Sequence, residues 1–425
     1  CSGSSNLRDG GPRYHTAAET GVKSVRVGLF LAPFVWGSLL FAQHSAVDQA
    51  WDLAAKGQRQ AAIEVLHKTI ANNPSDADAR LLLGSLLSDG GNAPEAIAQL
   101  SEAVRLRPQS VDAQNALGEA YLAAGNAQRA RVPFERAVKL NPQFAIAQVN
   151  LGAVLIQTGR YESAAEHLDF ALKLLEKGGD AAYAHYLRAK VYSANNDPRN
   201  AVTQLEMALA LRPDYPEAWS DLGQARKLLL DDRGALAAEK KAVELNPRDA
   251  VAQYRLGAEL LRQDEPAAAV PHLQEAFRLD PHDQSTLNAL QSALRREGKQ
   301  DEAAAVKQKL RELLREKDQA SQNAVQAVKV NNEGATLEKA GDLRGALERY
   351  RKAVDLYPEH VGMRVNYAVV LLRLGQWMDG LSEMQKALDL DPANQSIWRA
   401  LQDALKQAPP TVVAQWKKNA PEHSR

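Results

Sequence analysis

The sequence predicts an all-α protein in which antiparallel helix pairs stack on one another. Three observations predict this fold: prolines recur at 34-residue intervals, small residues keep fixed distances from those prolines, and the leucines between them follow the spacing of one helix face. A helix pair of this size cannot bury enough apolar surface alone, so each pair must stack on its neighbours. We therefore expect one coupled array of repeats.

Eight prolines mark the ends of repeats. They are Pro74, Pro108, Pro142, Pro213, Pro247, Pro281, Pro358 and Pro392, and five of the seven intervals between them have the same length. Each of the two longer intervals contains one repeat that lacks the proline. Because proline cannot continue a helix and pushes the preceding residue out of the helical region, each proline is expected to follow the end of a second helix.

Small residues recur at two fixed distances before each proline. Twenty-four residues before it stand Ala50, Gly84, Gly118, Ala189, Gly223, Gly257, Gly334 and Ala368, and twelve before it stand Ala62, Ala96, Ala130, Ala201, Ala235, Ala269, Ala346 and Gly380. Alanine is abundant, at 72 of the 425 residues, but all sixteen of these positions are Ala or Gly. Small side chains at a helix crossing allow the two axes to approach closely, so these positions predict where the helices of a pair cross.

The pattern resembles the tetratricopeptide repeat, whose signature is W-x₂-L-G-x₂-Y…A-x₃-F…P. Matching residues are Trp219, Leu222 and Gly223 in one repeat, and Leu117, Gly118, Tyr121, Ala130, Phe134 and Pro142 in another. Turn pairs such as Gly91-Asn92 and Gly341-Asp342 separate the two helices. The resemblance covers about 43–405 and implies an α-solenoid, a right-handed superhelix of antiparallel helix pairs.

We define ten repeats from this register: 43–76, 77–110, 111–144, 145–181, 182–215, 216–249, 250–283, 284–326, 327–360 and 361–394. Repeats 1–4 occupy 43–181, repeats 5–8 occupy 182–326, and repeats 9–10 plus a capping helix at 395–405 occupy 327–405. The second helix of repeat 8 is expected to be longer than its neighbours, and the stack to bend or loosen there. The segment 406–425 is expected to be a flexible tail.

Composition excludes several classes of function. Lys plus Arg and Asp plus Glu are both 52, so the net charge of zero gives nucleic acid no long-range attraction. The single cysteine, Cys1, excludes an internal disulfide framework and a cysteine-based zinc site. No GxGxxG, P-loop, HExxH or GxSxG motif occurs, and the nine histidines are scattered. We therefore predict no catalytic residue, no cofactor and no metal.

Residues 1–42 form a separate segment. Lys23 and Arg26 precede the uncharged stretch 27–42, which is typical of a secretory signal peptide cleaved near Ala42–Gln43. The alternative is an uncleaved membrane anchor over 27–42, although the stretch is short for a spanning helix. Residues 1–21 do not suit a bacterial-type signal, so we expect translation to begin at Val22. A lipidated Cys1 is the alternative, and it leaves the apolar stretch unexplained.

The resemblance also implies where a partner binds. In this family the first helix of each repeat lines the concave groove, at positions about 30, 27 and 23 residues before the proline. The residues expected to bind a partner there are Asn115, Glu119, Tyr183, Tyr186, Lys190, Gln224, Tyr254 and Asn331, together with Asn150, Asn332 and Asn366, which lie one residue further along the chain. Amide side chains can both donate and accept hydrogen bonds, so they can pair with the backbone of an extended peptide, and tyrosines add contact area with a polar end.

Two relationships within the family refine this expectation. Asn150, Asn332 and Asn366 resemble part of the asparagine ladder of O-linked N-acetylglucosamine transferases, but Asp48, Leu82 and other residues interrupt it. No three successive first helices carry the Lys/Arg and Asn set of a carboxylate clamp, which disfavours a chaperone-tail adaptor.

The sequence therefore predicts a non-catalytic scaffold that binds protein or peptide partners. The export signal favours a secreted or periplasmic role in envelope assembly or secretion. The alternative function is the regulatory repeat array of a larger enzyme, such as a glycosyltransferase or a kinase.

Overall fold

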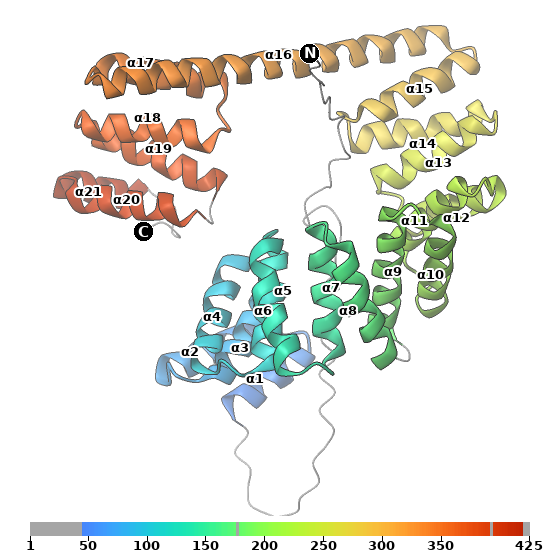
Figure 1. The fold of residues 1–425 in the computed structure, drawn as a ribbon, viewed down its shortest axis with the longest axis horizontal. Coiled ribbons are helices and arrows are strands. Elements are labelled where there is room, and N and C mark those ends of the chain that lie inside the picture. Colours follow the sequence, from blue (N-terminus) through green and yellow to red (C-terminus); the bar gives the residue numbers. More distant parts are fainter. Residues whose placement is uncertain (1–44, 176–177, 392–393, 420–425) are drawn as a thin grey trace, which may run out of the picture. The chain divides into compact units, whose positions relative to one another are not determined.

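The computed structural model describes residues 45–175, 178–391 and 394–419, and within these ranges it contains 21 α-helices and no strand (Figure 1). Two compact units divide the chain, one ending at Pro281 and the other beginning at His282. The helices of the first unit are α1 (Ala46–Ala55), α2 (Arg59–Asn72), α3 (Ala77–Asp89), α4 (Ala93–Leu106), α5 (Val111–Ala123), α6 (Ala127–Leu140), α7 (Ala145–Gln157), α8 (Tyr161–Leu174), α9 (Gly179–Ala194), α10 (Pro198–Leu211), α11 (Pro216–Leu228), α12 (Asp232–Leu245), α13 (Ala250–Arg262) and α14 (Pro266–Leu279). The second unit contains α15 (Gln284–Arg296), α16 (Gln300–Lys339), α17 (Leu343–Leu356), α18 (Val361–Arg373), α19 (Trp377–Leu390), α20 (Gln395–Gln407) and α21 (Pro410–Asn419).

The first unit consists of seven helix pairs, α1–α2 to α13–α14, one for each of repeats 1–7. Within each pair the two helices pack on each other, and each second helix from α2 to α12 also packs on the first helix of the following pair. First helices of successive repeats also contact one another; for example, α3 contacts α5 and α7 contacts α9. These contacts confirm the all-α repeat fold expected from the sequence.

The small residues lie where the helices of a pair cross, as expected. A Cβ atom added to Gly118 would lie 2.6 Å from ring carbons of Phe134, and one added to Gly257 would lie 2.6 Å from Leu273 Cγ. Real Cβ atoms do not come so close to other carbons, so any larger residue at these positions would push the two helices apart. Phe134 and Leu273 are fully buried against the glycines that face them.

A residue with positive φ ends the first helix of each repeat from 1 to 10. It is glycine in seven repeats, with φ between +72° and +85°, and the others are Asn196, Leu230 and Asp264. Glycine adopts this left-handed conformation without the steric cost that other residues incur, which is why the Gly-Asn and Gly-Asp pairs predicted the turns. Asn and Asp also tolerate this conformation, but leucine rarely adopts it. Leu230 nevertheless has φ at +61°, and its side chain is 84 % exposed, so burial does not compensate for the strain.

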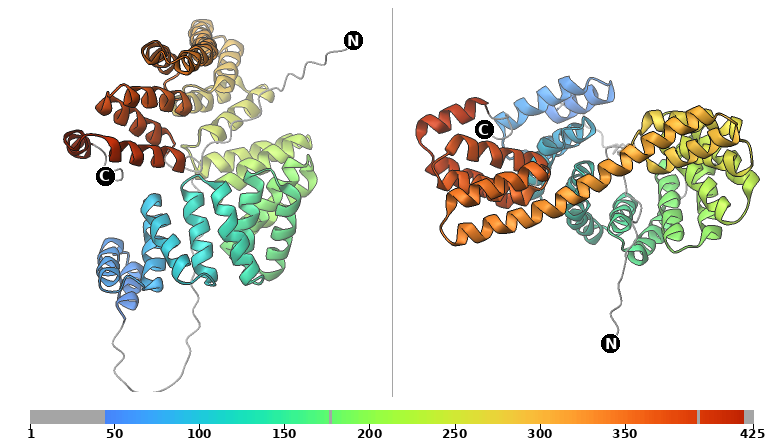
Figure 2. Two further views of the ribbon diagram at one scale, coloured as in Figure 1. Left: turned by 60° about the vertical axis from the view of Figure 1, so that its left-hand side comes forward. Right: turned by 90° about the horizontal axis from the view of Figure 1, so that it is seen from above.

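One helix of the second unit differs from the sequence-based expectation. The second helix of repeat 8 is longer than its neighbours, as expected, but it continues without a break into the first helix of repeat 9, which the repeat boundaries had placed as a separate helix, giving the 40-residue α16. Figures 1 and 2 show α15 beside its N-terminal part and α17 beside its C-terminal part. The physical reason is that no proline occurs between Gln300 and Lys339, and the only glycine, Gly334, comes after the junction.

The C-terminal segment also differs from expectation. We expected a flexible tail over 406–425, but residues 410–419 form α21, which packs on α19. Trp416 is only 4 % exposed and belongs to an apolar cluster with Leu388 and Leu401. Burial of this indole holds the segment in place, and Pro410 at its first position favours a helix start. This amphipathic pattern was overlooked in the sequence. Residues 420–425 lie outside the described residues.

The expectations for the N-terminal segment concern residues 1–42, which lie outside the described ranges. Within those ranges, no helix is both long enough and apolar enough to span a bilayer.

Candidate functional site

The residues expected to bind a partner all lie on first helices, but they differ in burial. Asn115 on α5 and Asn150 on α7 are buried, at 3 % and 6 % exposure. Asn332 on α16 is exposed. The remaining members are partly buried: Glu119, Tyr183, Tyr186, Lys190, Gln224, Tyr254, Asn331 and Asn366. The three asparagines that suggested a ladder therefore differ in accessibility, because Asn150 is buried, Asn366 is partly buried and Asn332 is exposed.

The two buried asparagines hold neighbouring repeats together. Asn150 Nδ2 donates hydrogen bonds to Asn115 Oδ1 at 3.1 Å and to Glu119 Oε1 at 3.0 Å. Asn115 Nδ2 donates to the same Glu119 oxygen at 2.9 Å. Burial raises the pKa of Glu119 to about 7, against the lowering effect of these two amide donors. The three side chains thus join repeat 3 to repeat 4.

The same positions meet at other junctions between repeats. We define a junction trio as three residues on two successive first helices that stand at the positions of Asn115, Glu119 and Asn150 in the repeat register, two on the first helix and one on the next. In repeats 9 and 10, Asn366 Nδ2 donates to Asn331 Oδ1 at 3.2 Å. Between repeats 4 and 5 the trio is apolar, and Val149, Ala153 and Leu187 pack together. The trio is thus polar at the junction of repeats 3 and 4 and apolar at the junction of repeats 4 and 5, so these two junctions differ in chemistry.

A charged and aromatic network lies on α9, α11 and α13. Lys190 Nζ donates to Asp221 Oδ2 at 3.0 Å and to Tyr186 OH at 3.2 Å. Arg255 NH1 contacts the other oxygen of Asp221 at 3.3 Å. Burial acts to raise the pKa of Asp221, but the charges of Lys190 and Arg255 outweigh it and lower the pKa. Asp221 is therefore an ionised link between repeats 5, 6 and 7.

Tyrosine rings extend this network along α9. The rings of Tyr183 and Tyr186 are stacked with centroids 6.4 Å apart, and the Tyr186 ring lies 4.8 Å from that of Tyr215. The guanidinium of Arg212 lies 3.3 Å from the centroid of the Tyr215 ring. These contacts fix the tyrosines in one arrangement, so a partner would not have to order them on binding.

Next to this network lies a small hollow of about 70 Å³, which we call the repeat 6–7 hollow. Two of the residues expected to bind a partner, Gln224 and Tyr254, line it together with Arg255, Lys227, Glu239 and Glu259. Glu239 is 3 % exposed and accepts a hydrogen bond from Ser220 at 3.3 Å. Burial raises the pKa of Glu239 to about 8, although the charge of Arg255 opposes the shift.

Glu239 occupies a position that is apolar in the other repeats of this unit. The residue eight positions before the proline is Leu100, Phe134, Leu205 or Leu273 elsewhere, and each is fully buried. In repeat 6 the carboxylate lies over Gly223, where an added Cβ atom would be 2.7 Å from Oε1. The sequence carries this signal as a single acidic residue in an apolar column, and the sequence-based expectation did not use it.

A polar pair inside several repeats was also missed at the level of sequence. Gln148 Nε2 donates to the carbonyl oxygen of Pro142 at 2.9 Å, while its Oε1 lies 2.6 Å from His167 Nδ1. Gln253 on α13 pairs with His272 on α14 in the same way. In repeat 5 the histidine, His185, is on the first helix and the glutamine, Gln204, is on the second. Burial lowers the pKa of His167 and His272. These histidines are therefore structural partners of glutamines on the other helix of the same pair.

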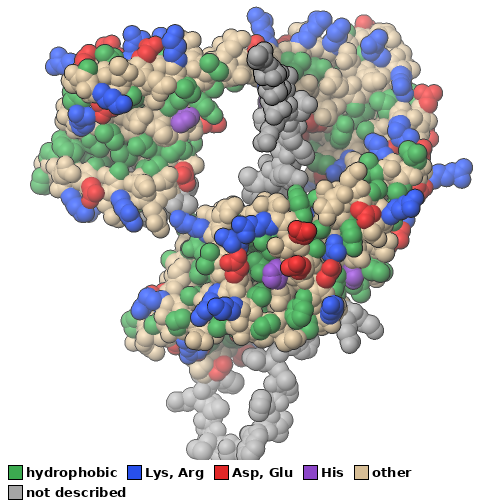
Figure 3. Space-filling view, in the orientation of Figure 1, with side chains coloured by type: hydrophobic (Ala, Val, Ile, Leu, Met, Phe, Trp, Pro, Cys, Tyr) green, Lys and Arg blue, Asp and Glu red, His purple; other side chains and the backbone are tan. Residues whose placement is uncertain are grey.

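The described residues contain no group of three or more His, Cys, Asp or Glu side chains placed to hold a metal ion. On the face visible in Figure 3, Lys and Arg side chains are interspersed with Asp and Glu side chains. This mixture agrees with the net charge of zero.

Comparison with known proteins identifies the repeats. Family models described as tetratricopeptide repeat match residues 47–111, 81–133, 143–214, 186–250 and 337–407, which together make up more than half of the chain. A curated relative, the DnaJ homolog subfamily C member 7 homolog of Schizosaccharomyces pombe, is 25 % identical over 211 residues. That match covers 48 % of this chain and 38 % of the relative, so the chain spans well under half of the relative's length.

Solved structures resemble parts of the chain. The match to a tetratricopeptide repeat protein from Parabacteroides merdae has a TM-score of 0.47 and 17 % identity, and covers 59 % of this chain and 97 % of that one. The match to the pilF protein of Pseudomonas aeruginosa has a TM-score of 0.46 and 19 % identity, and covers 50 % and 95 % of the two chains. The matched family models and the observed stack of helix pairs lead to one conclusion. The chain belongs to the tetratricopeptide repeat family.

Proposed function

We propose that the protein is a non-catalytic scaffold that binds an extended polypeptide along the first helices of repeats 5–7. The observation that carries this proposal is the repeat 6–7 hollow, which Gln224 of α11 and Tyr254 of α13 line together. Repeat arrays of this kind serve as interaction scaffolds through their extended concave surfaces. A hollow lined by side chains from two successive repeats is suited to one side chain of a peptide that crosses both.

The chemistry of the surface supports an extended peptide as the ligand. Tyr186 and Tyr254 offer aromatic area, and Gln224 offers both a donor and an acceptor for peptide backbone groups. Asn115 and Asn150 bond to each other and to Glu119, so we assign them to the joint between repeats and not to the binding surface. Asp221 is likewise engaged by Lys190 and Arg255.

Peptide binding tests this proposal. Peptides selected from a random displayed library on the full chain should lose affinity when Tyr254→Ala and Gln224→Ala are combined, by about tenfold or more, since both variants remove contacts at the centre of the site. Fluorescence anisotropy would measure the dissociation constants. Tyr357→Ala with Gln143→Ala is the matched control, because both of these side chains are exposed elsewhere. Equal loss of affinity in the control, or none in the test variant, would refute the site.

We further propose that the protein is exported and acts in envelope assembly or secretion. This proposal rests on the uncharged stretch 27–42 behind Lys23 and Arg26. N-terminal sequencing of the protein recovered from its native host tests it, with a mature chain beginning at Gln43 as the expected result. A mature chain that begins at Cys1 would contradict the export signal proposed here.

A further inference from the structure

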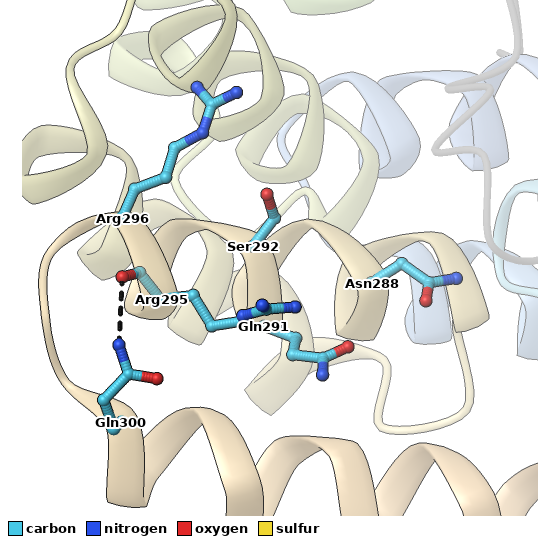
Figure 4. Close-up of a pocket in the computed structure, with 6 residues that line it drawn as sticks. All are labelled: Asn288, Gln291, Ser292, Arg295, Arg296 and Gln300. Atoms are coloured by element: carbon cyan, nitrogen blue, oxygen red, sulfur yellow. Dashed lines mark hydrogen bonds between the residues drawn. The ribbon is translucent and has the colours of Figure 1, made fainter.

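The long helix α16 leaves one face of the second unit uncovered. This face, which we call the open face of repeat 8, contains a hollow of about 450 Å³ lined by Asn288, Gln291, Ser292, Arg295, Arg296 and Gln300. Figure 4 shows these side chains along α15 and at the start of α16. In a regular array, the first helix of the next repeat packs against this part of a helix pair, as α7 packs against α5.

The register of the sequence identifies what this face lacks. Asn288 and Ser292 lie one repeat period after Tyr254 and Ala258, so they are the two residues that repeat 8 contributes to a junction trio. The third member of that trio, at the matching position of repeat 9, is Asn332. An asparagine at the same place in repeat 4, Asn150, bonds to Asn115 across a buried junction.

The trio of repeats 8 and 9 is not assembled within the chain. Asn288 and Asn332 are both exposed, whereas Asn115 and Asn150 are buried. Every residue from 314 to 322 is exposed, so α16 is a bare single helix between its two packed parts. Asn332 lies nineteen positions after Leu313, the last buried residue of the first part, which is about 28 Å of helix at 1.5 Å per residue. A continuous helix cannot fold back to bring repeat 9 onto repeat 8.

We propose that two copies of this chain form a dimer in which repeat 9 of each copy stacks on the open face of repeat 8 of the other. The partner that covers this face is a second copy, because the residue that completes the trio with Asn288 and Ser292 is Asn332 of this same sequence. Asn332 cannot reach the open face within its own chain, so it must come from another copy. A two-fold symmetric exchange covers the open faces of both copies at once and leaves no unfilled end. Asn332 Nδ2 would then donate to the Asn288 side chain of the other copy.

The mass of the full chain in solution is the first test. Multi-angle light scattering should give twice the 46.4 kDa of one chain. A mass of 46.4 kDa at all concentrations would overturn the proposal. A dimer that dissociates on dilution would support it, since exchange dimers obey mass action.

Cross-linking between copies locates the contact. In a Cys1→Ser background, chains carrying Asn288→Cys and chains carrying Asn332→Cys are unfolded and refolded together, then treated with a short bis-maleimide. We expect a covalent dimer from this mixture and almost none when Gln322→Cys replaces Asn332→Cys, because residue 322 is also exposed but lies about 15 Å away along α16. Equal yields in the two mixtures would overturn the proposal, as would a double variant that cross-links only within one chain.

A variant with a broken helix tests the cause. Ala320→Gly with Ser321→Pro interrupts the bare part of α16, which allows repeat 9 to turn back onto repeat 8 of its own chain. The expected result is a shift from dimer to monomer, with cross-linking of the Asn288→Cys/Asn332→Cys pair now within one chain. A variant that stays dimeric with its cross-links between copies would show that α16 does not enforce the exchange.

Discussion

Phe134→Ala is expected to lower the free energy of unfolding by about 3–5 kcal/mol. The Phe134 ring is fully buried, and it lies over Gly118 so closely that an added Cβ atom there would be 2.6 Å from the ring. Removing the ring leaves a cavity at the crossing of α5 and α6, and these backbone segments cannot close it fully. Urea unfolding followed by circular dichroism would measure the change.

Val132→Ala is the matched control for this prediction. Val132 lies on the same helix, α6, but is 61 % exposed, so the free energy of unfolding should change by less than about 0.5 kcal/mol. Similar losses from the two variants would show that Phe134 is not the residue that fills the crossing, and the repeat register would then be wrong. Because the repeats are coupled, the loss should also spread to neighbouring pairs.

Glu239→Leu is expected to raise the free energy of unfolding, on the order of 1–4 kcal/mol above pH 8. The substitution places an apolar side chain where Leu100, Leu205 and Leu273 stand in other repeats. It also removes a buried carboxyl group that accepts a hydrogen bond from Ser220. Urea unfolding at several pH values would measure the effect. A loss of stability at high pH would show that the carboxylate is needed for folding.

The pH dependence of this effect follows from the raised pKa of Glu239. The unfolded chain loses the Glu239 proton near pH 4.5, whereas the folded chain keeps it up to about pH 8. Between these values the folded state binds more protons, so the contribution of this group to stability is greatest below pH 4.5 and falls as the pH rises towards 8. Glu239→Gln should make this decline shallower. The raised pKa of Glu119, about 7, leaves part of the slope in place.

The 34-residue period was sufficient to predict the helix pairs, because proline, glycine and small residues act locally or between adjacent helices. The fused helix α16 was not predicted, although its local signal is present in the sequence. Residues 300–333 contain neither proline nor glycine, so nothing there ends a helix, but the repeat register implied a helix end at the boundary between repeats 8 and 9. At the C-terminus a helix forms where the repeat pattern predicts none. Trp416 is buried in an apolar cluster and holds α21 in place, although this segment is not part of any repeat.

The binding surface was predicted less completely than the fold. The register placed all eleven expected residues on first helices, but it could not show that Asn115 and Asn150 would bond to each other across repeats. Their pairing depends on the stagger between neighbouring first helices, which one repeat alone does not reveal. Glu239 and the glutamine–histidine pairs were readable as columns in the sequence. The glutamine–histidine pairs were missed because they lie outside the family signature, whereas Glu239 stands at the signature position of Phe134 and its departure from the apolar column was not used.

Site-specific photo-cross-linking tests the central claim most directly. Benzoylphenylalanine would replace Tyr254 or Gln224 in the repeat 6–7 hollow, and Lys240 on the exposed side of α12 as the control. A selected peptide is then irradiated with each variant and the attachment sites are mapped by mass spectrometry. We expect the peptide to attach at positions 254 and 224 and not at 240. Attachment at 240 alone, or equally at all three positions, would contradict binding along the first helices.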